Sequence, residues 1–395
     1  MANVSSSNGL EKRPKLRFPG FDEPWRAAQL GDLLIELSDY ATQESGFPLL
    51  TSSRQGLFVQ EDYKQANAET TVFSVLPYGC ITYRHMSDDN IFHFNINRLV
   101  ANGLVSKEYP VFTVRKEVLD TDFLVDTLNS SPLFSVFCIQ QKKGGTRTRL
   151  YFKTLCSYQM FLPVLHEQQV IASFIRLLDK RIERQMELVE TLKKYKRGVN
   201  KQLLSQIDNS CNCRLGSVCE IVGGGTPDTL HTEYWGSSVE WFTPSEIGKT
   251  KYVSRSVRKL SDIGLNNSSA KLLPIGTVLL TTRATLGEMS IAKRECCTNQ
   301  GFQSLIPHQD RALSEYLYYM QIIIKPWCEK YASGNTFREI SKSALSNCII
   351  PLPDRARQEE IVKLLSSIDT LISAEEGIAM SLSKMRHSLM QQLFI

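Results

Sequence analysis

An internal repeat is the feature that most constrains what this 395-residue chain folds into. Residues 144–155 (GGTRTRLYFKTL) align without gaps with residues 334–345 (GNTFREISKSAL), at an offset of 190 residues. Pro163 and Pro353 continue the alignment at the same offset, and Leu30 matches Leu215 at an offset of 185. Solenoid repeats have periods of roughly 20–50 residues. The much longer period here predicts two whole globular domains.

A heptad pattern follows each copy of the domain. Apolar residues recur at alternating steps of four and three over residues 171–203, and again over residues 361–393 at the offset of 190. Such spacing is the a/d seam of a coiled coil. The two seams are interrupted by polar residues at the same two places, which pair Gln185 with Glu375 and Lys196 with Arg386. The matched interruptions indicate common descent and suggest a role in setting the helix register.

The length of the two helices favours a partner outside each helix's own domain. A helix of about 40 residues spans roughly 60 Å, which exceeds the diameter of a single small domain. Gly377 interrupts the second helix and would weaken it in isolation by about 1 kcal/mol. We therefore expect the two helices to pack on each other rather than each to cap its own domain only. A pseudo-twofold relation between the units makes the pair antiparallel.

The repeat predicts five segments along the chain: an arm over 1–17, a first domain over 18–163, a helix over 164–208, a second domain over 209–353 and a helix over 354–395. Pro163, Pro351 and Pro353 mark the domain–helix junctions, since proline ends a strand and disfavours a helix just before it. The arm is polar and lacks the apolar core of a signal peptide. The chain also has no run of about 18 apolar residues. We expect a disordered arm, a cytoplasmic protein and no membrane partner.

The two domains mix short strands with a few helices, without regular βαβ alternation. This mixture predicts the α+β class. Strands are expected at 57–59, 71–76, 80–84, 111–114, 218–222, 239–243, 277–282 and 289–291. Helices are expected at 122–128 and 133–137 and near 314–324 and 326–333.

The net charge excludes few classes of partner, and the spacing of the cysteines does not support a metal site. The formal net charge is +5, which is compatible with a polyanionic partner without requiring one. Cys211 and Cys213 are separated by one residue, and Cys296 and Cys297 are adjacent. Neither spacing matches the C-x-x-C pairs of structural zinc sites. We therefore expect no metal site, and we expect the cysteines to be reduced thiols.

No catalytic motif appears along the chain. The glycine-rich stretch from Gly223 to Thr226 lacks the lysine of a phosphate-binding loop. Residues 62–64 (DYK) resemble part of a metal-dependent nuclease site, but no second acidic residue on a preceding strand accompanies them. The six histidines show no paired spacing. We predict no catalytic residues and expect that the chain by itself is not an enzyme.

Several residues are candidates for DNA binding. Gly224, Gly225 and Thr226 leave a predicted strand as a tight loop, which is either a turn or a site where backbone amides approach a phosphate. Thr282 and Arg283 end another strand, as Arg84 does in the first domain. An arginine there either grips a guanine edge or a phosphate or makes a structural ion pair.

A basic cluster precedes the first long helix. It consists of Lys142, Lys143, Arg147 and Arg149, with Arg338 in the second copy. These side chains either contact the DNA backbone, which positions a protein without specifying sequence, or belong to a solvated loop.

The chain resembles the specificity subunits of type I restriction–modification systems over residues 15–395. The matching segments of the first domain are residues 15–21 (KLRFPGF), Trp25, residues 30–33 (LGDL), Leu162-Pro163 and Glu167-Gln168. Those of the second are Gly224-Gly225-Thr226-Pro227, Tyr234-Trp235-Gly236, Trp241, Asn299-Gln300-Gly301-Phe302, Gly334-Asn335-Thr336, Pro351-Leu352-Pro353, Gln358-Glu359 and residues 391–394 (QQLF). The motif matches add Gln300 and Asn335 to the candidate DNA-binding residues. The first domain lacks the Gly-Gly-Thr-Pro and Asn-Gln-Gly-Phe segments, so its reading surface is not mapped.

The resemblance implies two target-recognition domains, each reading half of an asymmetric bipartite site in double-stranded DNA. The helix pair would act as a ruler for the spacer between the half-sites. Two methyltransferase subunits and two restriction–translocation subunits would dock on the chain. S-adenosylmethionine, ATP and Mg²⁺ would bind to those partners and not to this chain, which would carry no cofactor. The alternatives are a self-contained DNA-modifying enzyme and a helical scaffold with no role on DNA.

Overall fold

The computed structural model describes residues 11–60, 71–142, 144, 146–283, 285–334 and 338–394. The chain forms two compact units. Unit 1 comprises Met1–Met186 and Gly377–Ile395, and unit 2 comprises Glu187–Glu376. Each unit therefore contains one domain together with one half of each long helix.

Unit 1 is built from small antiparallel sheets. One has the order β1 (Glu11–Lys12), β2 (Trp25–Gln29), β14 (Gln159–Leu162), and another β10 (Phe94–Ile96), β8 (Ile81–Tyr83), β12 (Val111–Val114), β3 (Leu34–Glu36). A third has the order β11 (Asn102–Ser106), β7 (Phe73–Pro77), β4 (Tyr40–Ala41), and two pairs join β13 (Thr148–Arg149) to β9 (Met86–Ser87) and β5 (Leu50–Ser53) to β6 (Gly56–Val59). Its short helices are α1 (Leu30–Leu33), η1 (Gln43–Ser45), α2 (Thr121–Ser130), α3 (Pro132–Gln140) and α4 (Phe152–Cys156).

The core of unit 1 is rich in aromatic side chains. Trp25 of β2 is 1% exposed, and its ring lies edge-on to Phe123 of α2 with a centroid separation of 5.8 Å. Phe123 in turn packs on Phe394 at 5.5 Å. The end of the second long helix therefore completes the core of the first domain.

Unit 2 has one five-stranded sheet and two smaller ones. The large sheet has the order β16 (Cys219–Gly223), β23 (Gln303–Pro307), β20 (Val278–Leu280), β21 (Met289–Ala292), β18 (Tyr252–Val253). The smaller sheets are β19 (Arg258–Leu260), β17 (Trp235–Phe242), β22 (Cys296–Thr298) and the pair β15 (Asn212–Arg214), β24 (Ile349–Pro351). Its short helices are η3 (Asn209–Cys211), η4 (Leu215–Ser217), η5 (Thr232–Tyr234), η6 (Pro244–Glu246), α6 (Asp262–Asn266), α7 (Ser314–Tyr319), α8 (Gln321–Tyr331) and α9 (Lys342–Ser346).

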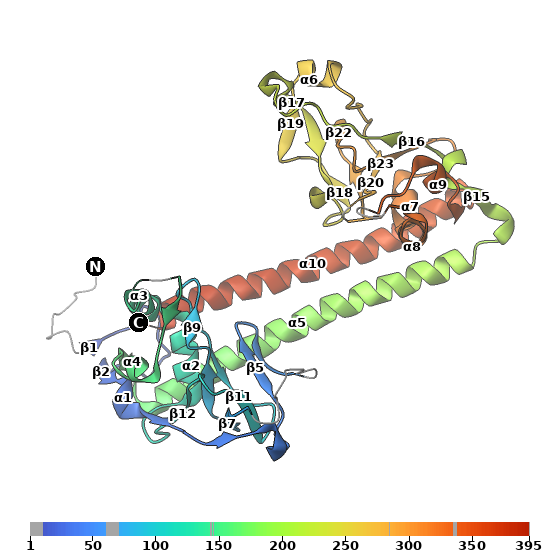
Figure 1. Ribbon diagram of the computed structural model, residues 1–395. Coiled ribbons are helices and arrows are strands. Elements are labelled where there is room, and N and C mark those ends of the chain that lie inside the picture. The colour runs from blue at the N-terminus through green and yellow to red at the C-terminus, as the bar shows by residue number, and fades with distance from the viewer. Residues whose placement is uncertain are drawn as a thin grey trace. The chain divides into compact units, whose positions relative to one another are not determined.

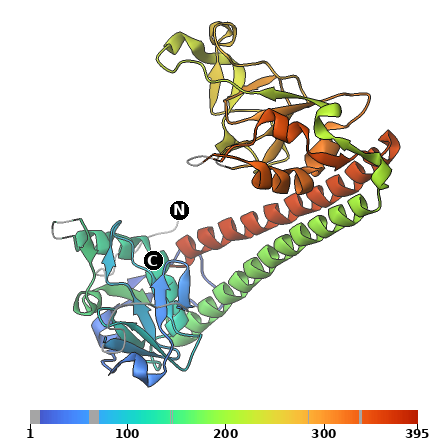
Figure 2. The same ribbon diagram turned by 45° about the vertical axis from the view of Figure 1, so that its right-hand side comes forward.

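The two long helices are α5 (Leu165–Ser205) and α10 (Arg355–Leu393). In unit 1, Arg386 of α10 pairs with Asp179 of α5. In unit 2, Lys196 of α5 pairs with Asp369 of α10. Later residues of one helix thus meet earlier residues of the other, and the helices run alongside each other in both views (Figures 1 and 2). The predicted α+β fold with an antiparallel helix pair is confirmed.

The repeat is visible as equivalent contacts in the two units. The helices α4 and α9 and the starts of α5 and α10 are related by the offset of 190. The Leu30 amide donates to the Tyr158 carbonyl (3.0 Å), as the Leu215 amide does to the Cys348 carbonyl (2.8 Å). A Cβ atom on Gly216 would lie 1.9 Å from Ser346 Oγ, so a side chain at this position would require Ser346 to move where η4 approaches α9.

Most of the predicted helices and strands are present in the structure, and many of them begin or end a few residues from the predicted positions. The strand expected at 111–114 is β12, and the helices expected near 122–128 and 133–137 are α2 and α3. The predicted helix break near Pro326 is wrong: the break lies at Met320, and Pro326 is inside α8. Ile324 and Cys328 on either side of that proline are fully buried, and this packing maintains the helix although proline removes one backbone hydrogen bond. No helix in the described residues is long and apolar enough to cross a membrane.

Candidate nucleic-acid interface

In unit 2 three loops that are distant in sequence meet around Gly301. The Thr226 hydroxyl donates to the Gln300 side-chain oxygen. The Thr282 amide donates to the Gly301 carbonyl at 2.8 Å. Both Thr226 and Gln300 are exposed. The fold therefore brings together four of the predicted DNA-binding residues, namely Thr226, Thr282, Arg283 and Gln300, at the edge formed by the ends of β16 and β20 and the start of β23.

The glycines of this site have a packing role. The amide of Gly225 donates to the Thr298 carbonyl at 2.9 Å, and that of Gly224 to the Phe302 carbonyl at 3.4 Å. A Cβ atom on Gly224 would lie 2.0 Å from the Asn299 carbonyl oxygen. Because both amides already have backbone acceptors, the interpretation of Gly224 and Gly225 as a phosphate cradle is wrong. Gly224 is required because it lies directly against Thr298 and Asn299, and Gly225 because its Cβ would lie 2.3 Å from the Ser269 carbonyl oxygen.

Arg283 makes the structural ion pair that the sequence left open. Its Nε donates to Glu339 at 2.8 Å, and its Nη2 lies 2.7 Å from the same carboxylate oxygen. The Arg283 side chain remains 41% exposed. Glu339 therefore fixes the direction of the guanidinium while leaving N–H donors unused by this pair.

Arg338 lies next to that carboxylate in sequence. It is exposed, and its Nη2 donates to the Glu329 carbonyl at 2.6 Å. The backbone around it is held by paired hydrogen bonds between Ser333 and Glu339. Asn335, the remaining candidate of this loop, lies outside the described residues.

In unit 1 the candidate arginines gather around β9 and β13. Arg149 pairs with Met86 across the two strands, and the Leu150 amide donates to the His85 carbonyl at 2.9 Å. Burial lowers the pKa of His85; the Glu108 carboxylate opposes this, and Arg149 and Arg84 lower the pKa further. Both guanidinium groups are thus close enough to act on the His85 ring.

Other basic side chains lie near the same strands. Arg147 is exposed and donates to Asp88 at 2.7 Å, and Lys142 is exposed after α3. Lys143 lies outside the described residues, as do residues 62–64 with their nuclease-like pattern. The first domain thus brings Arg84, Arg147 and Arg149 to neighbouring positions around β9 and β13.

The sequence reasoning missed Arg258. Its guanidinium carbon lies 3.4 Å from the centroid of the Trp235 ring and 5.6 Å from that of Trp241. An arginine stacked on tryptophan is held flat by a cation–π interaction. In the sequence Arg258 looks like one charge among several in 255–259 (RSVRK). Only the strand pairing of β17 with β19, which places Trp241 opposite Arg258, gives it an aromatic platform.

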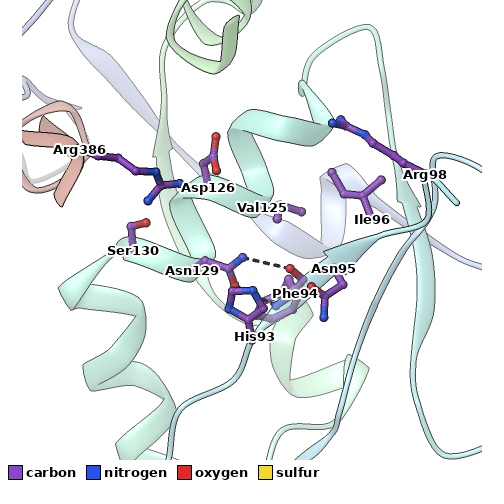
Figure 3. A pocket seen from close by; sticks show the side chains of 10 residues that line it. All are labelled: His93, Phe94, Asn95, Ile96, Arg98, Val125, Asp126, Asn129, Ser130 and Arg386. Carbon is purple, nitrogen blue, oxygen red and sulfur yellow. Dashed lines mark hydrogen bonds between the residues drawn. The ribbon is translucent and has the colours of Figure 1, made fainter. Parts of the chain in front are cut away.

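A polar pocket of about 390 Å³ opens in unit 1 between β10, α2 and α10. Figure 3 shows the Asn129 amide bonded to the Phe94 backbone and the Asp126 carboxyl close to Arg386. Burial raises the pKa of Asp126 to about 7, against the lowering effect of Arg386. None of the predicted DNA-binding residues lines this pocket.

Among the residues that the structure describes, no group of three histidine, cysteine or acidic side chains is placed to hold a metal ion.

These observations define a chain of two β-rich domains joined by one antiparallel helix pair, with polar and basic loops on each domain. The family described as type I restriction modification DNA specificity domain matches residues 104–194 and 208–384. The match covers more than half of the chain. The protein belongs to this family.

The chain is similar in sequence to several specificity subunits. It is 35% identical over 186 residues to the type I restriction enzyme MjaIX specificity subunit of Methanocaldococcus jannaschii, a match that covers 46% of this chain and 43% of the relative. It is 28% identical over 222 residues to the EcoR124I/EcoR124II specificity subunit of Escherichia coli, covering 52% and 54%. The putative MjaX specificity subunit of Methanocaldococcus jannaschii is 22% identical over 340 residues, covering 79% and 78%. The alignments with the first two relatives span about half of their length.

Two solved structures share the fold. The specificity subunit of a type I restriction–modification system from M. genitalium aligns with a TM-score of 0.54 and 15% identity, covering 97% of this chain and 99% of that one. A chain from a structural study of assembly and conformational transition of the type I restriction–modification system aligns with a TM-score of 0.61 and 18% identity, covering 96% and 99%. At these identities the likeness concerns the fold alone.

Proposed function

We propose that the chain is the DNA sequence-specificity subunit of a type I restriction–modification complex and that it catalyses no reaction by itself. The observation that carries the proposal is the duplication of one domain on one antiparallel helix pair, in a chain of the specificity family. Two diverged copies of a reading domain suit an asymmetric bipartite site, because each copy reads one half-site. We expect the complex to work in the cytoplasm on double-stranded DNA.

The residues proposed to contact DNA fall into two groups. Base contacts in the second domain are assigned to Thr226, Arg283 and Gln300, and Asn335, outside the described residues, stays a predicted contact. Thr282 is 0% exposed, so it supports these residues from below and touches no base. An arginine that offers paired N–H donors recognises guanine in the major groove, and Glu339 presets the direction of the Arg283 guanidinium. Phosphate contacts are assigned to the exposed cations Arg84, Lys142, Arg147, Arg149 and Arg338, and to Lys143 from its place in the sequence, since such contacts position the protein.

The helix pair is proposed to measure the spacer. A flexible linker would allow many separations between two reading domains, whereas packed helices hold a single one. The ion pairs Asp179–Arg386 and Lys196–Asp369 tie α5 to α10 within each unit. Both pairs favour a fixed register over sliding of the two helices.

An exposed apolar stripe along α10 supports the docking of partner subunits. Its members are seven residues apart and 43–54% exposed: Leu364, Leu371, Ile378 and Met385. The exposed small residues Ser367, Ala374 and Ser381 lie between them at helical spacing. A stripe of this kind on a helix that already buries its other seam is typical of a protein-binding surface. We assign it to the methyltransferase subunits, two of which dock together with two restriction–translocation subunits that bind ATP and Mg²⁺.

The test uses the chain in complex with its methyltransferase partner. Selection of bound duplexes from a random-sequence pool is expected to yield one bipartite motif, and sequencing of methylated adenines in the host genome is expected to show the same motif. Arg283→Ala should relax the half-site of the second domain and leave the other half-site unchanged. Absence of any sequence-selective binding would contradict the proposal. Cleavage or methylation by the isolated chain would favour a self-contained enzyme instead.

A further inference from the structure

Two buried glutamines occupy equivalent positions at the start of the long helices. Gln168 lies in the first turn of α5 and Gln358 in the first turn of α10, and they are related by the offset of 190. Their exposed fractions are 0% and 1%. A buried uncharged amide is retained only where its polar atoms are bonded, since an unpaired one costs about 1–3 kcal/mol.

Each amide makes the same three hydrogen bonds to backbone. Gln168 Oε1 accepts from the Asp120 amide at 2.8 Å, and its Nε2 donates to the carbonyls of Val118 and Pro163, both at 3.0 Å. In the second unit Gln358 Oε1 accepts from the Leu313 amide at 3.1 Å. Its Nε2 donates to the carbonyls of Arg311 (2.9 Å) and Pro353 (3.0 Å).

The partners of each glutamine belong to two different parts of the unit. Two of them lie in the domain, just before α2 in unit 1 and just before α7 in unit 2. The third is the proline carbonyl at the junction with the long helix. Each side chain therefore bonds the domain to the base of the helix that follows it.

The chemistry of this contact is specific to glutamine. The site needs one acceptor and two donors on one planar group, which an amide provides. A glutamate of the same shape would place carboxylate oxygen against two carbonyl oxygens. An asparagine would be one methylene too short to keep all three bonds.

We propose that Gln168 and Gln358 are positioning residues that fix the angle of each DNA-reading domain on its helix, and so determine the spacer length that the complex accepts. The inference rests on the proposed function. Buried side chains such as Ile171 and Ile175 already attach the first domain to α5, but apolar contact is non-directional. Hydrogen bonds are directional, so the amide supplies the angular restraint.

The scale of the effect follows from the dimensions of a domain. A rotation of about 10° at the base of a domain roughly 30 Å across moves its far surface by about 5 Å. One base pair advances the DNA by about 3.4 Å. Loss of the angular restraint is therefore enough to let a reading domain reach a half-site displaced by one base pair.

The test compares Gln168→Glu with Gln169→Glu in the full complex with the methyltransferase subunits. Gln169 is exposed, so it makes a matched control with the same change of charge. Affinity is measured for duplexes with the cognate spacer and with spacers one base pair longer and shorter, the half-sites being constant. Gln168→Glu is expected to reduce the preference for the cognate spacer about tenfold, and Gln358→Glu to do the same from the other domain. The control should keep the wild-type ratio.

A merely structural role would lower affinity for all spacers alike and leave that ratio unchanged, which would overturn the proposal. Gln168→Met keeps the length of the side chain without its hydrogen bonds, and it provides the second variant if the buried carboxylate unfolds the domain. Unfolding by both variants would also overturn the proposal. If the wild-type complex itself prefers no spacer length, the proposed function fails. If the wild type is selective and the variants are equally selective, only the positioning role fails.

Discussion

The Lys196 ammonium of α5 forms an ion pair with the Asp369 carboxylate of α10. The residues related to this pair by the offset of 190 form the equivalent ion pair. Arg386 of α10, which corresponds to Lys196, pairs with Asp179 of α5, which corresponds to Asp369. Lys196 and Arg386 are one of the two matched pairs of polar residues that interrupt the apolar seams. Each of these two basic residues is therefore matched by an acid on the opposite helix, and the register of α5 against α10 is fixed by one such ion pair in each unit.

Charge reversal at Lys196 should destabilise unit 2. The side chains of Lys196 and Asp369 are only 22% and 24% exposed, so Lys196→Glu is expected to lower the free energy of unfolding by about 1–3 kcal/mol. Addition of Asp369→Lys should recover part of the loss, but not all of it, because Asp369 also accepts from the Tyr319 hydroxyl at 2.6 Å. Urea denaturation of both single variants and the double variant gives the coupling energy. Lys194→Glu, at an exposed position, is the control, and a coupling energy of zero would show that the pair does not set the register.

Alanine should stabilise the long helices at two glycines. Gly198 in α5 and Gly377 in α10 are exposed, and a Cβ atom on either would meet no atom within 4 Å. Each substitution is expected to raise the free energy of unfolding by about 0.5–1 kcal/mol, because glycine is the poorest helix former after proline. The denaturation midpoint should rise with an unchanged slope. Gly264→Ala is the opposite control, since its Cβ would lie 2.1 Å from the Tyr234 carbonyl oxygen; a loss of stability in Gly377→Ala would contradict the expectation.

Stability should depend on pH through Asp126. The folded state raises the pKa of this carboxyl from 3.8 to about 7, so between these values the folded chain binds more protons than the unfolded chain. The contribution of Asp126 to stability is therefore full below about pH 4 and is lost as the pH rises towards 7. Asp126→Asn should raise the free energy of unfolding at pH 8 by roughly 1–2 kcal/mol and change it little at pH 4. Denaturation of the wild type and of Asp126→Asn at both pH values tests this. If the free energy of unfolding depends on pH in the same way in both proteins, Asp126 is not the cause of the dependence.

Lengthening the helix pair should lengthen the recognised spacer. Insertion of seven residues after Met186 and seven after Glu376 keeps both heptad seams in phase and adds about 10 Å at 1.5 Å per residue. At about 3.4 Å per base pair, the preferred spacer should grow by roughly three base pairs while both half-sites stay the same. Selection from a random-sequence pool reports spacer and half-sites together. Three-residue insertions, which break the seams, serve as the control, and altered half-sites would argue against a ruler.

The sequence predicted the helix pair well because a heptad seam is a local signal. The positions of Lys196 and Arg386 were evident, but their partners Asp179 and Asp369 were not. Which acid faces which base depends on the register of two helices far apart in sequence, and side-chain type alone does not determine it. The helix break at Met320 was missed for a related reason, since burial of Ile324 and Cys328 overrides the local effect of Pro326.

The candidate site was less predictable than the fold. The sequence predicted Gly224 and Gly225 to form a tight turn or a phosphate-binding loop, because glycine is conformationally free. In the structure they are required because the backbone of residues 269, 298 and 299 lies too close to leave room for a side chain. Their hydrogen-bond acceptors, Thr298 and Phe302, are more than seventy residues away in the chain. Arg283 remained ambiguous until Glu339 was placed beside it. Long-range contacts decided each of these outcomes.

Phe394 has a consequence for how the chain is made. It packs on Phe123, and the neighbouring Gln392 carbonyl accepts from the Leu16 amide at 3.0 Å. A ribosome releases residues 1–186 and then all of unit 2 before these side chains exist. Unit 2 is one continuous segment, Glu187–Glu376, so it is able to complete its core during synthesis. The domain that is synthesised first is therefore completed after unit 2, and it must wait with an unfilled aromatic core until residues 377–394 have been synthesised.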